Sequence, residues 1–144
     1  MKKTILIIED TSRKRVNISD WLELKDFNLI CAKDGISGIL LAKMFPVDLI
    51  ISEINLSKLN GFEVLKELRK NFSTAKTPFI FLTAKTDPET RNLAQQLGAN
   101  DYLTQPLRFS DFLQIIKNQL DSPSEINQNQ QALHKAEKSL VNLC

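Results

Sequence analysis

Five short apolar runs, each followed by a segment with helical spacing, constrain the fold of this 144-residue chain most strongly. Such runs, bounded by turn residues, are typical of strands in a parallel sheet that is covered on both faces. The predicted strands are 4–8, 28–32, 47–52, 78–82 and 101–103. The predicted helices are 12–25, 35–44, 61–71, 88–97 and 109–120. Because crossovers between parallel strands are right-handed, this β-α order predicts an α/β fold with one doubly wound, five-stranded parallel sheet.

The apolar residues of the predicted helices repeat at helical spacing and are expected to face the sheet. In the first two helices they are Val16, Ile18, Trp21, Leu22, Leu24, Ile36, Ile39, Leu40 and Met44. Trp21 lies on such an apolar face, so we interpret it as a core residue.

The composition changes after residue 121, which predicts a domain over 1–121 and a linker with a helical tail over 122–144. The sequence Asp121-Ser-Pro-Ser124 marks the break, and the residues beyond it are mostly polar. Ile126, Leu133 and Leu140 are seven residues apart, which suggests a coiled coil. The repeat spans fewer than three heptads, so a frayed helix or a linker remnant is an equal alternative.

Charge and cysteine usage exclude several classes of function. The net charge is +2 and the basic residues are scattered, so we expect no nucleic-acid binding by this chain. Cys31 and Cys144 lie far apart, no CxxC motif occurs and there is one histidine, so disulfide scaffolds and zinc sites are not expected. Neither a signal peptide nor a membrane span is indicated. We therefore expect a cytoplasmic protein in a reducing compartment.

Acidic and hydroxyl residues stand at the ends of the predicted strands, where sites form in open parallel sheets. Glu9 and Asp10 follow the first strand, Glu53 follows the third, and Thr83 follows the fourth. Asp10 or Thr11 could instead cap the next helix, but a cap accounts for one acid only.

Four linked motifs resemble the receiver domain of response regulators in two-component signalling, close to the chemotaxis receiver. They are ILIIED (5–10), DLIISEINLSKLNGFEVL (48–65), PFIFLTA (78–84) and GANDYLTQP (98–106). The resemblance covers residues 4 to about 120. It implies a flavodoxin-like sheet with strand order 2-1-3-4-5 and five flanking helices, so that the first and third strands end side by side.

The resemblance also implies roles for residues in one acidic cleft. Glu9 and Asp10 match the acidic pair of the family, and Thr83 matches its switch hydroxyl. Tyr102 matches its switch aromatic, although it could equally be a residue that only covers the sheet edge. The main-chain carbonyl of Asn55 would join Glu9, Asp10 and Glu53 as a metal ligand. Gln105–Pro106 matches a cis peptide bond of the family.

Two positions of the chain depart from the family pattern. Glu53 stands where the family carries a phosphorylatable aspartate, and Gln105 stands where it carries a lysine. Ser57, where the family often has proline, is a smaller departure. Glutamate moves the carboxylate outward by roughly 1.5 Å, and glutamine brings no positive charge, so conventional phosphotransfer is expected to fail. Lys58 or Lys85 could replace the missing cation.

For the metal, we expect weak Mg²⁺ binding or none. Three acids favour a hard divalent cation, whereas the longer Glu53 side chain disturbs octahedral geometry. Without metal, one of the acids should hold a proton at raised pKa.

The sequence therefore favours a pseudo-receiver, a non-enzymatic module that acts by protein contact. Glu53 would either mimic the phosphorylated state or be an inert acid. Partners, a sensor kinase or a downstream protein, would dock on the face at roughly 88–120, and the tail could add a homodimer contact. The alternatives are a phosphoacceptor receiver with metal-dependent phosphorylation and, more remotely, a flavodoxin-like ligand-binding module, although no glycine-rich phosphate loop follows the first strand.

Overall fold

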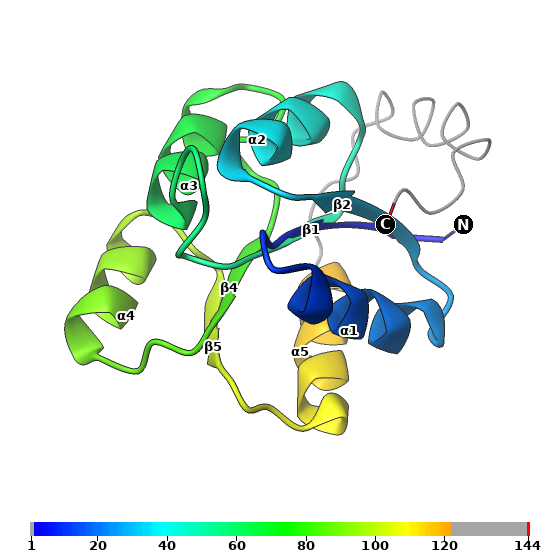
Figure 1. Cartoon of the computed structure of the whole chain (residues 1–144). Helices are drawn as coiled ribbons and strands as arrows, with labels where there is room; N and C mark the ends of the chain where they lie inside the picture. Colours follow the sequence, from blue (N-terminus) through cyan, green and yellow to red (C-terminus); the bar gives the residue numbers. More distant parts are fainter. Residues whose placement is uncertain (1, 122–143) are drawn as a thin grey trace.

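The computed structural model describes residues 2–121 and Cys144. Figure 1 shows a central parallel sheet between two layers of helices. The strands are β1 (Thr4–Ile8), β2 (Asn28–Ala32), β3 (Leu49–Ser52), β4 (Phe79–Thr83) and β5 (Asp101–Thr104). The helices are α1 (Ser12–Glu23), α2 (Gly35–Met44), α3 (Gly61–Lys70), α4 (Pro88–Gln96) and α5 (Phe109–Asp121).

The strand order is β2-β1-β3-β4-β5, and every pairing is parallel. This confirms the predicted fold class and sheet order. Each predicted element is present, and no end moves by more than two residues. Strand β4 reaches Thr83 because that residue pairs with Thr104 of β5, which brings the hydroxyl to the carboxyl edge of the sheet.

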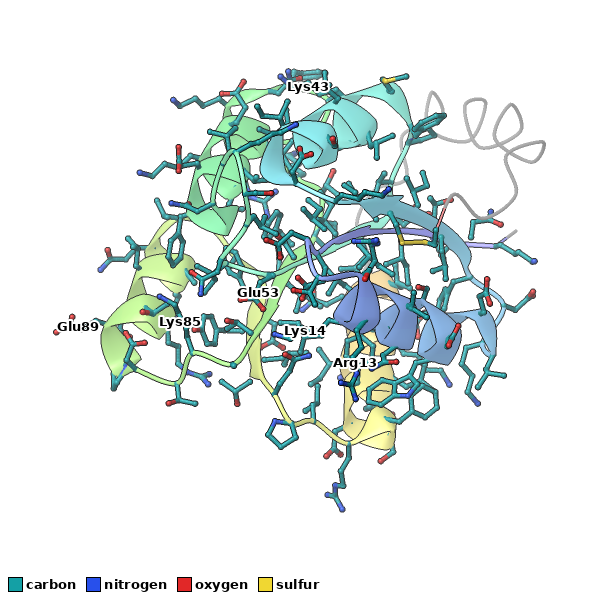
Figure 2. The ribbon with its side chains drawn as sticks, viewed as in Figure 1. Arg13, Lys14, Lys43, Glu53, Lys85 and Glu89 are labelled. Atoms are coloured by element: carbon teal, nitrogen blue, oxygen red, sulfur yellow. A yellow bond between two sulfur atoms is a disulfide. The ribbon has the colours of Figure 1, made fainter. Side chains whose placement is uncertain are left out.

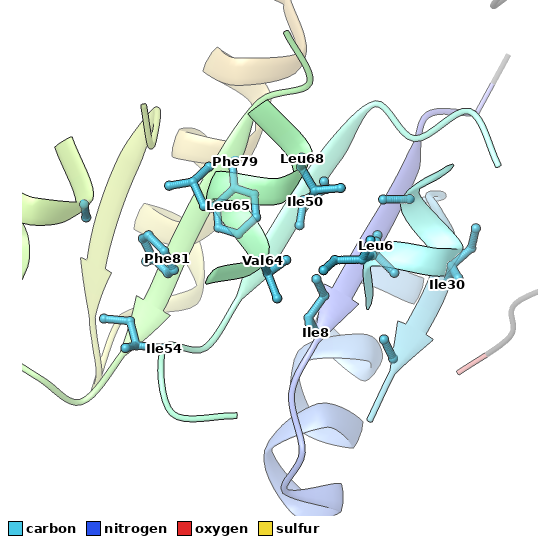
Figure 3. Close-up of a cluster of buried hydrophobic side chains, with 14 of the residues drawn as sticks. Leu6, Ile8, Ile30, Ile50, Ile54, Val64, Leu65, Leu68, Phe79 and Phe81 are labelled. Carbon is cyan, nitrogen blue, oxygen red and sulfur yellow. The ribbon is translucent and has the colours of Figure 1, made fainter. Parts of the chain in front are cut away.

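Apolar side chains on the two faces of the sheet form two separate cores. Helices α1 and α5 cover one face, and α2, α3 and α4 cover the other (Figure 1). The core beneath α2, α3 and α4 contains the fully buried Phe79 and Phe81, which pack between the sheet and α3 (Figure 3). Trp21, expected in the core, is only half-buried, with its ring packed edge-on against Phe109 at 5.3 Å.

Four apolar residues of α2 are predicted to face the sheet, and for three of them this prediction is wrong. Ile36, Leu40 and Met44 are exposed, and only Ile39 is buried. Helix α2 instead turns small residues toward the sheet: a Cβ on Gly38 would lie 2.6 Å from Ile8 Cδ1. Close approach of helix and sheet leaves no room for large side chains on the inner face. Of the residues predicted for the inner face of the helix over 12–25, Val16 and Leu24 are also exposed, while Ile18 and Leu22 are buried as expected.

Cys31 and Cys144 form a disulfide bond, with Cα atoms 4.7 Å apart. The cysteine spacing predicts no disulfide scaffold and does not anticipate this bond. Because both cysteines are paired, unpaired thiols give no support to the expected reducing compartment. A separation of 113 residues along the chain says nothing about distance in space. Cys31 lies on β2, at one edge of the described sheet, where another part of the chain can reach it. Cys144 is exposed.

The predicted linker and helical tail over 122–144, with the heptad pattern, lie outside the described residues except for Cys144. Over the described part of the chain, no helix is long and apolar enough to cross a membrane.

Candidate functional site

A cleft of about 410 Å³ lies at the carboxyl ends of β1, β3 and β4. Five residues singled out from the sequence line it together: Glu9, Asp10, Glu53, Asn55 and Thr83. Its other lining residues are Thr11, Lys14, Ala84 and Lys85. Parallel strands bring their carboxyl ends to one edge of the sheet, so residues distant in sequence meet there.

Glu53 is buried, with 7% of its surface exposed, directly after β3. Its Oε1 accepts hydrogen bonds from the Ile54 N–H at 3.0 Å and from the Thr83 hydroxyl at 2.6 Å. Its other oxygen, Oε2, is buried without a hydrogen-bond partner within the described residues. A buried carboxylate oxygen without a hydrogen-bond partner is costly, so this oxygen is free to accept a further contact from a cation or a water molecule.

Gly61 allows the loop after Glu53 to fold back tightly onto the strand end. The Gly61 N–H donates to the Ile54 carbonyl at 2.7 Å. A Cβ at this position would lie 2.4 Å from the Glu53 carbonyl oxygen. The glycine that opens α3 therefore helps to fix the backbone that carries Glu53.

Among the acids of the cleft, Glu9 has a clearly raised pKa. Burial raises the pKa of Glu9 to about 7, and a hydrogen bond with Asp10 and the charge of Glu53 add to the rise. The Thr11 N–H, which donates to Glu9 Oε2 at 3.2 Å, opposes it. This agrees with the expectation that one acid of the cleft holds a proton in the absence of metal. Thr11 stands at the N-cap of α1 without a side-chain capping bond.

Thr83 links Glu53 to the loop that follows β4. Its hydroxyl donates to Glu53 and accepts from the Lys85 N–H at 3.3 Å. The Tyr102 hydroxyl donates to the Lys85 carbonyl at 2.9 Å. Both peptide groups of Lys85 are thus held, one through Thr83 and one through Tyr102.

Tyr102 lies inside the protein, with 6% of its surface exposed. Its ring packs against Phe81, with ring centroids 6.3 Å apart. The Arg91 guanidinium of α4 lies over the same ring, 4.9 Å from its centroid, which is a cation–π arrangement. Burial raises the pKa of Tyr102. Sequence reasoning missed Arg91, because nothing in the sequence relates the phase of α4 to strand β5.

The Gln105–Pro106 peptide bond is cis, as expected. The Gln105 N–H donates to the Thr83 carbonyl at 2.9 Å, which extends the pairing of β4 and β5 by one residue. Gln105 is not among the residues that line the cleft.

Two lysines line the cleft, Lys14 from α1 and Lys85 after β4. Figure 2 shows them on either side of Glu53. Lys85 was one of the two lysines expected near the cleft. The other, Lys58, instead lies 3.6 Å from Asp34, the residue that caps α2. Sequence reasoning missed Lys14, which belongs to a short basic group that resembles an ordinary solvated helix face.

No group of three or more His, Cys, Asp or Glu side chains that could hold a metal ion occurs among the residues that the structure describes. The carboxylates of Glu9, Asp10 and Glu53 all line the cleft.

A comparison with known protein families identifies the family to which the chain belongs. The family model "Response regulator receiver domain" matches residues 5–117. The chain therefore belongs to the response regulator receiver family, the receiver domains of two-component signalling.

Two of the curated relatives are longer than this chain. The chain is 31% identical over 156 residues to the "Probable transcriptional regulator ycf29" of Pyropia yezoensis, an alignment that covers 99% of this chain and 70% of the relative. It is 33% identical over 109 residues to the "Cell cycle response regulator CtrA" of Brucella ovis, covering 76% of this chain and 46% of the relative. The chain thus spans only part of each relative.

Among solved structures, the fold is similar to the receiver domain of the sensor histidine kinase PA1611 from Pseudomonas aeruginosa PAO1. The TM-score is 0.79 at 26% identity, and the match covers 85% of this chain and 100% of that one. That structure is described as having a magnesium ion coordinated in its active site cleft.

Proposed function

We propose that this chain is a pseudo-receiver in which Glu53 stands in for the phosphorylated residue and the domain acts by protein contact without the usual phosphotransfer. The observation that carries this proposal is the 2.6 Å hydrogen bond from the Thr83 hydroxyl to Glu53 Oε1. The longer side chain reaches the hydroxyl directly. In this proposal Glu53 occupies the phosphoacceptor position of the family.

The state of Tyr102 supports the same proposal. The tyrosine is buried beneath the loop after β4, and its hydroxyl holds the carbonyl of Lys85, the residue whose N–H faces Thr83. A carboxylate at position 53 that accepts from the Thr83 hydroxyl therefore also favours the observed loop conformation at Lys85. That conformation in turn favours the buried position of Tyr102. The alternative, an inert acid, would not require the Thr83 hydroxyl to lie within hydrogen-bond distance of Glu53.

Gln105, in the position that we assign to the family lysine, supports a loss of phosphotransfer. Stabilising the developing charge on a transferred phosphoryl group requires cations placed at its oxygens. Gln105 supplies none and does not line the cleft. Lys14 and Lys85 do line it, and they could neutralise an anion there without the geometry of the usual lysine.

The cleft has the donor chemistry of a weak Mg²⁺ site. Glu9, Asp10 and Glu53 would hold the ion with the main-chain carbonyl of Asn55, and the orphaned Glu53 Oε2 is an oxygen that a cation would satisfy. When bound, the ion would offset most of the negative charge of the three acids. Since the raised pKa of Glu9 keeps it partly protonated near pH 7, metal binding must displace a proton there.

The partner surface in this proposal is the face at roughly 88–120, formed by α4, β5 and α5. It carries Arg91, which joins α4 to the buried Tyr102. A change at Tyr102 would therefore alter the packing of α4. A sensor kinase or a downstream signalling protein is the partner class. The probable transcriptional regulator and the cell cycle response regulator among the relatives are examples of the proteins in which such a domain could work.

The intact mass after incubation with Mg²⁺ and a small-molecule phosphodonor tests the absence of phosphotransfer. The natural protein should gain no phosphoryl group. A Glu53→Asp, Gln105→Lys variant should gain one, which would show that the scaffold is competent and that these two residues disable it. Phosphorylation of the natural protein would instead favour the alternative, a working phosphoacceptor receiver.

A further inference from the structure

We propose that the Cys31–Cys144 bond is a thiol-exchange site, opened by a dithiol at Cys144, and that its redox state sets the local stability of strand β2. This inference concerns a site remote in function from the acidic cleft and does not depend on the proposed pseudo-receiver role.

The two cysteines differ in their exposure to an attacking thiol. Cys31 lies within β2, is half-buried and packs against the core between the sheet and the α1–α5 layer. Cys144 is exposed. Exchange proceeds by attack of a thiolate on one sulfur and expulsion of the other, so access decides which sulfur is attacked. The structure therefore directs attack to Cys144.

The domain does not need this bond as a staple. Disulfides are essential mainly in small domains that cannot build a sufficient core. Here both faces of the sheet carry extended buried cores with large side chains such as Phe79, Phe81 and Phe112. A single bond with an exposed sulfur, on a domain with its own core, belongs to the labile and regulatory class of disulfides.

Strand β2 connects this bond to the rest of the molecule. It is at one edge of the described sheet and is joined to β1, with Cys31 opposite Ile7. The next residue, Ala32, accepts a hydrogen bond from the Glu9 N–H at 3.1 Å. Loss of the covalent link should let the carboxyl end of β2 open more often and should expose the backbone of Glu9 with it.

The exchange step balances with a dithiol as the reductant. A thiolate of the dithiol bonds to the Cys144 sulfur, and the bond to Cys31 breaks. The Cys31 sulfur leaves with the electron pair and takes up a proton. The second thiol of the dithiol then displaces Cys144, which also takes up a proton. The dithiol ends as a disulfide, having supplied two electrons.

Two measurements test this inference on the full chain. In the first, the native protein is treated with dithiothreitol or with excess glutathione, and its intact mass and peptides are recorded. We expect dithiothreitol to add two hydrogens without unfolding, and glutathione to form its mixed disulfide on Cys144. Resistance of the bond to excess dithiothreitol, an adduct on Cys31, or two free thiols in protein purified in air would overturn the proposal.

In the second, hydrogen exchange is compared between the oxidised and the reduced protein. Protection of β2 and of the Glu9 amide should fall roughly tenfold or more on reduction, while β4 and β5 stay unchanged. A Cys144→Ser variant should match the reduced protein with or without reductant, and an exposed Ser73→Ala variant should match the natural one. Equal protection of β2 in the two redox states, or an equal loss over all strands, would contradict a local role.

Discussion

The Thr83 hydroxyl donates a hydrogen bond of 2.6 Å to Oε1 of Glu53, and both residues are buried. The bond joins the end of β3 to the end of β4, the two strands whose following loops form one side of the cleft. Through Lys85 it also connects the acidic cleft to the buried Tyr102.

Removing this hydroxyl should destabilise the domain. In a Thr83→Val variant the shape is kept, but Glu53 Oε1 loses its shortest hydrogen bond. We expect the free energy of unfolding to fall by about 1–3 kcal/mol, since a buried polar group is left poorly satisfied. Urea unfolding measures this, with Thr83→Ser as the control that keeps the donor. Equal stabilities of the Val and Ser variants would contradict a structural role for the bond.

The stability of the protein should fall as the pH rises between about 4.5 and 7. Burial raises the pKa of Glu9 from 4.5 in the unfolded chain to about 7, so the folded state binds more protons in this range. The full contribution is present below 4.5 and is lost through 7, at a cost of up to roughly 3 kcal/mol. Urea unfolding of Glu9→Gln should show a weaker pH dependence than the natural protein. The exposed Glu89→Gln is the control, and an unchanged slope in Glu9→Gln would refute the assignment.

A Gly61→Ala substitution should disturb the strand end that carries Glu53. The new Cβ would lie 2.4 Å from the Glu53 carbonyl oxygen and 2.8 Å from the Phe81 ring. Overpacking of this kind costs about 1–3 kcal/mol. Thermal unfolding should show the loss, whereas Lys66→Ala, at an exposed position of the same helix, should not. A Gly61→Ala protein as stable as the natural one would mean that the loop can shift freely.

Arg69 should be important for stability although no carboxylate pairs with it among the described residues. Its guanidinium donates to the carbonyls of Thr74, Thr77 and Gly98 and to the Asn100 side chain. Burial lowers the pKa of Arg69. Arg69→Ala should cost about 2–4 kcal/mol because several carbonyls lose a charged donor. Arg69→Lys should recover only part of this loss, since lysine lacks the planar fork. Urea unfolding of both variants measures these losses, with Lys70→Ala, at an exposed position, as the control.

Much of the fold followed from local patterns in the sequence. The apolar runs predicted all five strands, and the cis bond at Gln105–Pro106 and the strand order came with the resemblance to receivers. The cleft could be anticipated because carboxyl ends of parallel strands share one edge, and the structure gathers Glu9, Asp10, Glu53, Asn55 and Thr83 there. The roles of these residues remain predictions.

The rest depended on relationships that no local pattern contains. Gly38 lets α2 approach Ile8 closely, and this close approach sets the orientation of the helix. The spacing of apolar residues alone therefore predicted the wrong buried face. Lys14 lines the cleft, whereas Arg13 and Arg15 do not. Which of these three basic residues faces the cleft depends on the rotation of α1 about its axis. The pairing of Cys31 with Cys144 depends on the position of Cys144 beside β2, which no local pattern of the sequence contains.

The most direct test of the central claim is the environment of Tyr102, the single tyrosine of the chain, measured by NMR with selectively labelled tyrosine. We predict ring signals of a buried tyrosine in the natural protein, unchanged by Mg²⁺ and a phosphodonor. In the Glu53→Asp, Gln105→Lys variant, the shorter carboxylate should release Thr83 and shift these signals, and phosphorylation should restore them. A variant whose unphosphorylated spectrum matches the natural one, or a natural protein whose signals move with the donor, would contradict the claim that Glu53 stands in for a phosphorylated residue.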